Sequence, residues 1–534
     1  MDKNKFHQVL IRNLTIDLDQ YQQDLRSLAA KKLSISENSV LQVRLLRRAI
    51  DARGKRPKLV LHLAVRLSTP IDSRDSTVLA LPDPVALPEP ISVKGSPSVV
   101  VVGTGPAGMF AAWRLVQAGL SPIVLERGPK FPKRHEAVDR LRTLGELDPE
   151  ANFHFGLGGA GTYSDGKLYT RLDRPIVKTV LELLHRFGAG STDDILVEAH
   201  PHVGTDRWPK VLTNMMDFLS NNGATFHFET KVTGTIKSKD TITGLILQDG
   251  SIHCHAALLA PGNSARDLFH SLAEQSLAIE SKAFAVGVRM THPQSLIDSI
   301  QYGRAAGHPA LGPASYRLST RARSRGVYSF CMCPGGVVIP TPTEPGMLAI
   351  NGMSDSARSS REANAAIVVQ VGPDDFPGKG PLAGVEFQRR IEKAAYEAGG
   401  EDYGAPAQKL LDFLHGSSGT GHLPNCLYKP GLSRTNLNDL LPHEVAGSLQ
   451  QGLSTFCKRM KGLAHEKALL LGMESRTSSP VRILRDPDGM SPTLRGLFPA
   501  GEGAGYAGGI TSSAVDGIRQ ADALLAYLAS IAGK

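Results

Sequence analysis

The stretch Val99-Val-Val-Val-Gly103-Thr-Gly105-Pro-Ala-Gly108 is the segment around which the rest of the chain is organised. Four consecutive valines are typical of a parallel strand that is covered on both faces. Gly103 permits a tight turn, Gly105 lets the backbone approach a pyrophosphate, and Gly108 lets the next helix pack closely. A helix over 109–119 and a strand over 122–126 complete a predicted dinucleotide-binding unit.

Glu126 ends the second strand, where we expect its carboxylate to accept hydrogen bonds from both hydroxyls of an adenosine ribose. Pro106 and Ala107 open the helix, whose free N–H groups and partial positive charge favour phosphates. Arg127 follows the acidic residue directly. A glycine-rich turn without a nucleotide is the alternative, but the strand, the helix and the spacing of the acid all favour nucleotide binding.

Composition limits the class of protein. The chain has 534 residues, which predicts about two or three domains, and 41% of them are hydrophobic, as in a globular protein with a sizeable core. The formal net charge of +9 fits an anionic cofactor or substrate and does not indicate nucleic acid binding. We find no apolar run of about 20 residues and no secretory signal, and five cysteines favour a reducing compartment, so a cytoplasmic location is expected.

Residues 1–75 are predicted to form a small α+β module, in the β-α-β-β order of half a ferredoxin-like fold. The turn between its last two strands is basic, with Arg47, Arg48, Arg53, Lys55, Arg56 and Lys58. This turn either contacts phosphate or RNA or is a solvated hairpin tip. Residues 76–97 contain five prolines and are interpreted as an extended linker.

Residues 98–280 are assigned to the first part of the nucleotide domain, 281–470 to an inserted substrate domain and 471–534 to the closing part. Within the first part, the segment from Asn152 to Leu168 is rich in glycine, and we interpret it as a ligand loop, with a mobile surface loop as the alternative. The residues selected here as ligand-binding candidates are Gly159, Ala160, Gly161, Thr162, Ser164, Asp165, Lys167, Val232 and Gly262.

The closing segment Ala500-Gly501-Glu502, followed by Gly508-Gly509-Ile510, makes the pattern specific. Together with the opening motif it resembles the glutathione-reductase-type FAD fold. The resemblance implies an α/β Rossmann-like domain with an inserted α+β domain and noncovalently bound FAD. It also implies that Glu502 contacts the ribityl-pyrophosphate region and that the helix after Gly509 faces the flavin pyrimidine ring, where it stabilises negative charge.

Further stretches resemble the bacterial family of uncharacterised FAD-dependent dehydrogenases. They are Gly158–Leu168, Cys331–Gly336, Gly352–Arg358 and Glu474–Pro480. The resemblance covers essentially the whole chain and implies an oxidoreductase that passes a hydride between FAD and an unidentified small substrate, which we expect to be anionic. NAD(P)H is one candidate for a transient electron donor, although no second glycine fingerprint is present.

Lys167, Cys331 and Cys333 are the candidate catalytic residues. The two thiols either relay electrons or belong to a packed strand edge, and no metal-ligand set accompanies them. Arg358, Arg361 and Arg476 either bind a substrate carboxylate or form structural salt bridges. The alternative function is a non-catalytic redox sensor or RNA-associated adaptor, but no aromatic residue lies between Arg44 and Arg66 to stack on bases. The oligomeric state stays open.

Overall fold

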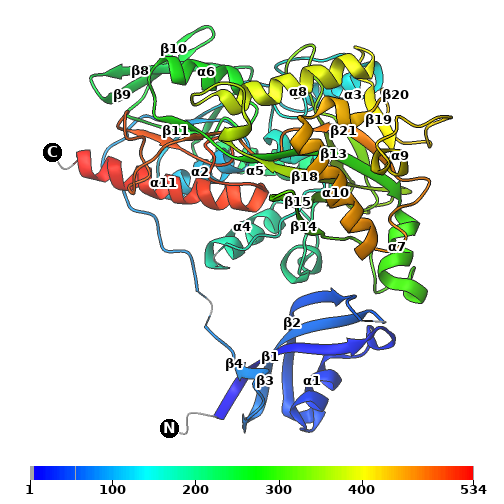
Figure 1. The fold of residues 1–534 in the computed structure, drawn as a ribbon. Coiled ribbons are helices and arrows are strands. Elements are labelled where there is room, and N and C mark those ends of the chain that lie inside the picture. The colour runs from blue at the N-terminus through cyan, green and yellow to red at the C-terminus, as the bar shows by residue number, and fades with distance from the viewer. Residues whose placement is uncertain (1–4, 55, 84, 173, 533–534) are drawn as a thin grey trace.

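The computed structural model describes residues 5–54, 56–83, 85–172 and 174–532, and it shows three parts (Figure 1). A small N-terminal module lies beside a larger body, and an extended segment joins the two. The body is built on two sheets, one parallel and one mainly antiparallel, and the second is inserted between strands of the first. This architecture is a mixed α/β fold.

The N-terminal module is a four-stranded antiparallel sheet with one helix, in the predicted β-α-β-β order. Its strand order is β2-β3-β1-β4. The last strand lies in the predicted linker and pairs with β1, so the module extends to Ala80 rather than ending at residue 75. The elements are β1 (Lys5–Asp17), α1 (Leu25–Leu33), β2 (Val40–Asp51), β3 (Lys58–Asp72) and β4 (Val78–Ala80). The ferredoxin-like assignment stays a prediction.

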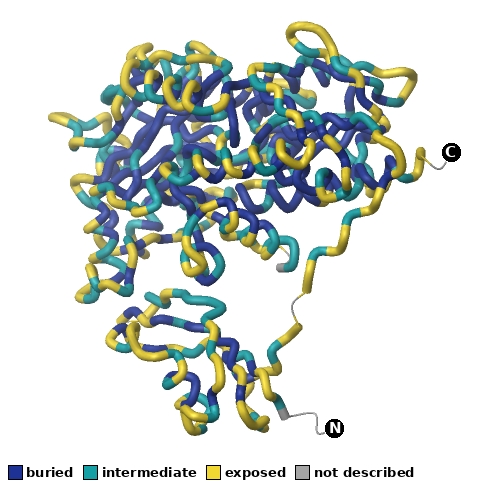
Figure 2. Tube along the Cα trace, turned by 180° about the vertical axis from the view of Figure 1, so that it is seen from behind, coloured by how far each residue is buried: buried dark blue, intermediate teal, exposed yellow. Residues whose placement is uncertain are grey.

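The segment 81–98 carries no regular element in its described residues and is mostly exposed (Figure 2). The C-terminal part of this segment nevertheless packs against the body, because Val93 is buried. The carbonyl of Pro88 accepts a hydrogen bond of 2.7 Å from Arg114 on α2 (Pro106–Gln117). The linker is therefore attached to the body at its C-terminal end.

The parallel sheet has five strands in the order β23-β11-β5-β6-β7. Each of the four valines in β5 is buried, as the sequence predicted. Val99 and Val101 pack with the helices on one face, whereas Val100 and Val102 pack with α6 and a three-stranded sheet on the other. The strands are β5 (Val99–Val102), β6 (Ile123–Leu125), β7 (Thr225–His227), β11 (Ala256–Leu259) and β23 (Leu497–Pro499).

Helices and a small antiparallel sheet surround the parallel sheet. The helices are α2, α3 (Lys133–Leu144), α4 (Arg174–Arg186), α5 (Trp208–Asn221), α6 (Arg266–Glu274) and α11 (Ile510–Ala532). The three-stranded sheet comprises β8 (Val232–Ser238), β9 (Thr241–Leu247) and β10 (Gly250–His253). Within the described residues, no helix combines the length and the apolar character needed to cross a membrane.

The insertion forms a seven-stranded sheet in the order β14-β15-β18-β13-β21-β19-β20. Its strand β21 spans Leu469–Glu474 and pairs with β13, so the insertion continues past the predicted boundary at residue 470. The other strands are β13 (Phe284–Pro293), β14 (Ser319–Ala322), β15 (Arg325–Cys333), β18 (Glu362–Val371), β19 (Ala405–Lys409) and β20 (Leu432–Arg434).

Two small sheets and several helices complete the inserted part. The pair β12 (Ile279–Ser281) and β22 (Val481–Ile483) holds the entering and leaving chain segments side by side. A second pair consists of β16 (Val337–Pro340) and β17 (Ile350–Met353). The helices are α7 (Gln294–Tyr302), α8 (Ala383–Gly399), α9 (Leu410–Leu414) and α10 (His443–Arg459).

Candidate functional site

A cavity of about 990 Å³ lies between the parallel sheet and the inserted sheet. On one side it begins where β5 and β11 end, at Val102 and Ala260. On the other side it is bounded by the end of β15, at Cys331 and Cys333. Ligands of open parallel sheets bind at the carboxyl ends of the strands, and the volume is at the upper end of the range for small-molecule sites.

Most residues predicted to bind the cofactor line this cavity. They are Gly103, Gly105, Pro106, Ala107, Glu126, Arg127, Gly159, Ala160, Gly161, Ser164, Asp165, Lys167, Val232, Gly262, Gly501, Glu502, Gly508, Gly509 and Ile510. Gly108 and Thr162 do not, so their assignment as direct contacts is corrected. Gly108 serves the packing of α2, and the Thr162 hydroxyl accepts a hydrogen bond of 3.1 Å from Arg134.

The glycines of the opening turn differ in what requires them. Gly103 has φ +97°, and a Cβ there would lie 2.3 Å from the Ala260 carbonyl oxygen. A Cβ at Gly108 would lie 1.9 Å from the Gly103 carbonyl oxygen. Gly105 has an ordinary φ of −65°, and a Cβ there would meet nothing within 4 Å. The fold therefore requires glycine at 103 and 108, whereas position 105 borders open space in the cavity.

The carboxylate of Glu126 is buried and accepts four hydrogen bonds from the protein. The amide and hydroxyl of Thr104 donate to Oε2 at 3.0 and 2.7 Å. The amides of Gly128 and Gly156 each donate to Oε1 at 3.0 Å. Glu126 thus joins the turn after β5 to the glycine-rich loop. Its contact with a ribose stays a prediction, which requires a ribose hydroxyl to replace one of these donors.

The glycine-rich loop is held by Arg134 on α3, which is fully buried. Its guanidinium donates hydrogen bonds to the carbonyls of Asn152, Phe153, Leu157 and Gly159 at 2.6–3.1 Å. Burial lowers the pKa of Arg134 to about 10, so the side chain stays charged at neutral pH. The loop is therefore a fixed wall of the cavity in this structure, and the mobile-loop alternative does not fit.

Asp165 is the centre of a charged cluster on the cavity wall. Its carboxylate lies 2.8 Å from the ammonium of Lys167 and accepts hydrogen bonds of 3.0 and 2.7 Å from Arg358. Ser354 also donates to it. Although burial raises the pKa of Asp165, Lys167 and Arg358 hold it well below its usual range. The cluster fixes the Lys167 ammonium, whose side chain is 40% exposed, at the cavity surface.

Cys331 and Cys333 lie at the end of β15, where a register shift interrupts its pairing with β18. Cys331 has φ +42° and lines the cavity, and the Cys333 thiol donates to the Cys331 carbonyl at 3.4 Å. Burial raises the pKa of Cys331 to about 11, and burial also raises that of Cys333. Protonated thiols are poor nucleophiles. Cys333 is buried, as in a packed strand edge, whereas Cys331 is exposed to the cavity, so the electron relay stays a prediction.

The closing motif borders the cavity beside the turn after β11. Asn263 donates a hydrogen bond of 2.8 Å to Glu502, and burial raises the pKa of Glu502 to about 7. Gly508 and Gly509 precede α11, and a Cβ at Gly508 would meet nothing within 4 Å. As at Gly105, the protein leaves room at a helix N-terminus that faces the cavity.

The wall between the two sheets contains His154 and Arg476. Nδ1 of His154 lies 3.0 Å from the Ser264 hydroxyl, while its buried Nε2 has no hydrogen-bond partner among the described residues. Burial lowers the pKa of His154 well below its usual value, so the ring is neutral.

The arginines predicted to bind a substrate carboxylate have other partners. Arg476 binds both oxygens of Glu392, at 3.0 and 2.7 Å. Arg358 binds both oxygens of Asp165. Arg361 does not line the cavity. The alternative interpretation, structural ion pairs, is therefore correct for Arg358 and Arg476.

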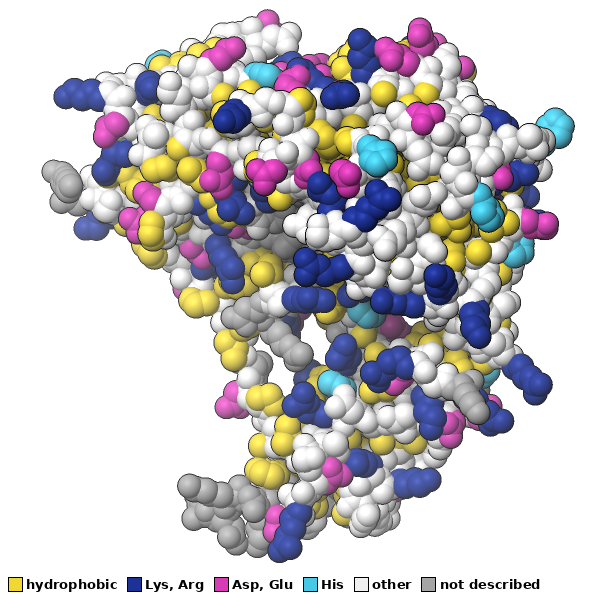
Figure 3. All heavy atoms as spheres, in the orientation of Figure 1, with side chains coloured by type: hydrophobic (Ala, Val, Ile, Leu, Met, Phe, Trp, Pro, Cys, Tyr) yellow, Lys and Arg dark blue, Asp and Glu magenta, His cyan; other side chains and the backbone are white. Residues whose placement is uncertain are grey.

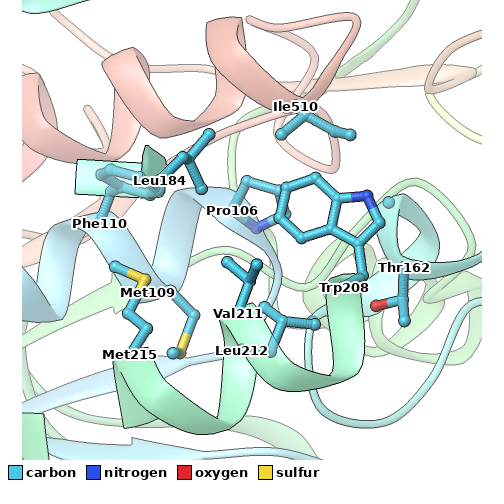
Figure 4. A pocket seen from close by; sticks show the side chains of 12 residues that line it. Pro106, Met109, Phe110, Thr162, Leu184, Trp208, Val211, Leu212, Met215 and Ile510 are labelled. Atoms are coloured by element: carbon cyan, nitrogen blue, oxygen red, sulfur yellow. The ribbon is translucent and has the colours of Figure 1, made fainter. Parts of the chain in front are cut away.

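A second, much smaller gap of about 20 Å³ lies behind the opening turn (Figure 4). Pro106, Trp208 and Ile510 face one another around it, and leucine and methionine side chains from neighbouring helices close it. Its lining is almost entirely apolar, and its volume is about that of one water molecule. We interpret it as a packing defect between α2, α5 and α11, which fix the glycine turn.

Five exposed residues of the lining were not predicted from the sequence: Arg53, Tyr169, His200, Ser315 and Arg317. Arg53 belongs to the basic turn that the sequence did identify. Its place at the cavity depends on how β2 lies against residues 198–199, which no local pattern reveals. The unpaired Nε2 of His154 was also missed, because a single histidine in a loop carries no specific signal.

Comparison with known proteins places the chain in a family. Residues 283–477 match the model of the family "FAD-dependent protein, C-terminal domain-like", and residues 8–66 match a domain of unknown function. An uncharacterised protein of Clostridium beijerinckii is 39% identical over 530 residues, which cover 97% of this chain and 98% of that protein. The chain therefore belongs, with this clostridial protein, to a family of uncharacterised FAD-dependent proteins. The family match over 283–477 also agrees with the extended boundary of the insertion.

Two solved structures illustrate more distant similarity. A geranylgeranyl bacteriochlorophyll reductase-like protein from Thermoplasma acidophilum is 13% identical, with 82% of this chain and 79% of that chain covered and a TM-score of 0.35. The flavin-dependent brominase Bmp2 is 11% identical, with 82% and 80% covered and a TM-score of 0.36. Similarity at this level carries no argument about the reaction of this chain.

Proposed function

We propose that this protein is an FAD-dependent oxidoreductase of the glutathione-reductase-type fold, which passes a hydride between noncovalently bound FAD and a small substrate. The observation that carries the proposal is the open space at Gly105. Nothing in the protein requires glycine there, whereas the absence of a side chain leaves room for a pyrophosphate beside the N-terminus of α2. The family match to FAD-dependent proteins supports the same ligand.

The residues fit an extended dinucleotide that crosses the cavity. The turn from Gly103 to Ala107 would hold the pyrophosphate, and the region of Glu126 and Arg127 would hold the adenosine. Gly508, Gly509 and the N-terminus of α11 would face the flavin pyrimidine ring. Bound FAD supplies the redox chemistry, so the chain needs only to bind, orient and tune it.

The polar groups of the cavity wall have defined roles in this proposal. Lys167 stays charged: burial lowers its pKa, but the Asp165 carboxylate, 2.8 Å away, favours the ammonium form and the net shift is upward. Its ammonium would stabilise negative charge on the flavin or on the substrate. The neutral ring of His154 would border the ligand as part of the same wall.

Absorbance spectroscopy of the purified protein tests the cofactor assignment, and anaerobic titration tests the reaction. We expect flavin bands, and acid denaturation should release the flavin into solution because attachment is noncovalent. NADH, NADPH and a panel of carboxylated and phosphorylated metabolites are then added without oxygen, and one of them should bleach the flavin. A protein that shows no flavin bands and takes up no added FAD refutes the proposal. A flavoprotein that no member of the panel reduces refutes the assigned reaction alone.

A further inference from the structure

The hairpin of the N-terminal module reaches the mouth of the cavity. Ala199 donates a backbone hydrogen bond of 2.8 Å to the Arg48 carbonyl, and the Arg48 guanidinium lies 2.6 Å from Glu198. These contacts place the end of β2 beside residues 198–200. Arg53, in the turn after β2, lines the cavity and is the one described module residue that does so.

The exposed residues at this mouth contact one another across three chain segments. Tyr169 and His200 meet edge to face at 4.7 Å between ring centroids, and Arg317 lies 5.9 Å from the Tyr169 ring. We call Arg53, Tyr169, His200 and Arg317 the rim. Figure 3 shows Lys and Arg side chains gathered on both sides of the hollow between the module and the body.

Arg317 differs from every other cation in the described lining. The other lysines and arginines there each pair with a carboxylate: Arg53 with Asp51, Arg127 and Lys231 with Glu150 and Asp267, Lys167 and Arg358 with Asp165, and Arg476 with Glu392. No carboxylate within the described chain forms an ion pair with Arg317, which lies over the Tyr169 ring. The rim therefore carries positive charge that no carboxylate of the described residues neutralises.

The electrostatic environment of His200 agrees with an excess of positive charge at the rim. Burial lowers the pKa of His200, and Arg317, Arg47 and Arg358 lower it further. Within the described part of the chain, no carboxylate opposes this effect at His200. Arg47 lies on β2, so the module and the body both supply cations to the same place.

We propose that the rim is a binding site for a phosphate or carboxylate group of the substrate, with Arg317 as its principal contact and Arg53 of the N-terminal module as a second. This inference rests on the proposed function, because the rim would hold the anionic end of a molecule whose other end meets the flavin. Planar guanidinium groups bind such oxyanions through two parallel hydrogen bonds. The module thus helps to select the substrate and takes no part in binding FAD.

Isothermal titration calorimetry on the full-length protein loaded with FAD tests the proposal. Bound FAD occupies the pyrophosphate space at the N-terminus of α2, so an added anion can then bind at the rim but not there. Pyrophosphate and succinate serve as probes for the phosphate and carboxylate sources. We expect one of them to bind, and its dissociation constant should rise about tenfold in Arg317→Ala, as for the loss of one charge-assisted contact. Arg53→Ala should weaken binding less, because Asp51 already shares its charge, and Arg317→Lys should bind more tightly than Arg317→Ala.

The matched control is Arg12→Ala, which removes an exposed arginine of the same module that does not line the cavity. It should bind both probes as the wild type does, and all four variants should keep the wild-type flavin content. The proposal is overturned if neither probe binds, if Arg317→Ala binds as tightly as the wild type, or if only a single-stranded oligonucleotide binds. Flavin absorbance reports separately on the proposed function, since loss of the anion site leaves it unchanged.

Discussion

Replacement of Gly105 by valine should remove FAD binding while the fold remains. The position has φ −65° and ψ 176°, which valine adopts readily, and a Cβ there meets no atom within 4 Å. Gly105 is the N-cap of α2, where a β-branched residue costs about 1 kcal/mol relative to a favourable cap. The side chain would occupy the space assigned to the pyrophosphate. Loss of two charge-assisted hydrogen bonds, at about 1.5–3 kcal/mol each, raises the dissociation constant of FAD by at least about 100-fold.

Gly108→Ala is the matched control, because it acts on the fold instead of the ligand. Its Cβ would lie 1.9 Å from the Gly103 carbonyl oxygen, so α2 must move, at a cost of about 1–3 kcal/mol or more. Calorimetric titration with FAD and thermal melting of the apoproteins separate the two effects. Wild-type affinity for FAD in Gly105→Val would refute the assignment of this space to the pyrophosphate. A melting temperature as low as that of Gly108→Ala would show that position 105 is structural.

Three further changes are expected to have distinct effects. Lys167→Met should keep its flavin, but its midpoint potential, measured by spectroelectrochemistry, should fall on the order of 30 mV, which corresponds to about 1.4 kcal/mol of lost charge stabilisation. Burial raises the pKa of Glu502 from 4.5 to about 7, so the folded apoprotein holds this proton more tightly than the unfolded chain does. The folded state therefore loses stability as the pH rises from 4.5 to 7. Glu502→Gln should lessen the fall in melting temperature over this pH interval. Glu474→Ala should destabilise the inserted part by about 3–5 kcal/mol in urea unfolding, because it leaves the buried Arg289 without its carboxylate.

The opening motif was predictable because its signals are local. A run of valines, glycines at fixed spacing and an acid at the end of the next strand all lie within 28 residues. The structure confirms the strand, the turn and the helix over these residues. It also explains the glycines individually, since the backbone itself excludes a side chain at Gly103 and Gly108.

The boundaries were less predictable, because a strand belongs to the sheet that contains its partner. The residues of β4 stand in a proline-rich segment and join the module only through three pairs with β1. Likewise, β21 is an apolar run that would suit either sheet of the body. Its antiparallel pairing with β13 decides the matter, and this partner lies about 180 residues earlier in the chain.

The ion pairs of the site were not predictable, because their members are far apart in the sequence. Asp165 and Arg358 are separated by 193 residues, and Glu392 and Arg476 by 84. A chain with 60 basic and 51 acidic residues offers many alternative pairs. Only the packing of the inserted sheet on the parallel sheet shows that the guanidinium groups of Arg358 and Arg476 already bind carboxylates. It also shows that Arg317 has no carboxylate partner among the described residues.

The same difference in ion pairing indicates where the cavity opens most easily. Between the two sheets, Glu392 is fully buried and pairs with both Arg266 and Arg476, and breaking such a pair costs about 3–5 kcal/mol. Between the N-terminal module and the body, Arg48 and Glu198 are 37% and 33% exposed, so their pair contributes at most about 1 kcal/mol. Separation of the hairpin from residues 198–200 is therefore easier than separation of the two sheets. A substrate would accordingly enter beside the rim, and Arg317, which pairs with no carboxylate of the described residues, lies on that path.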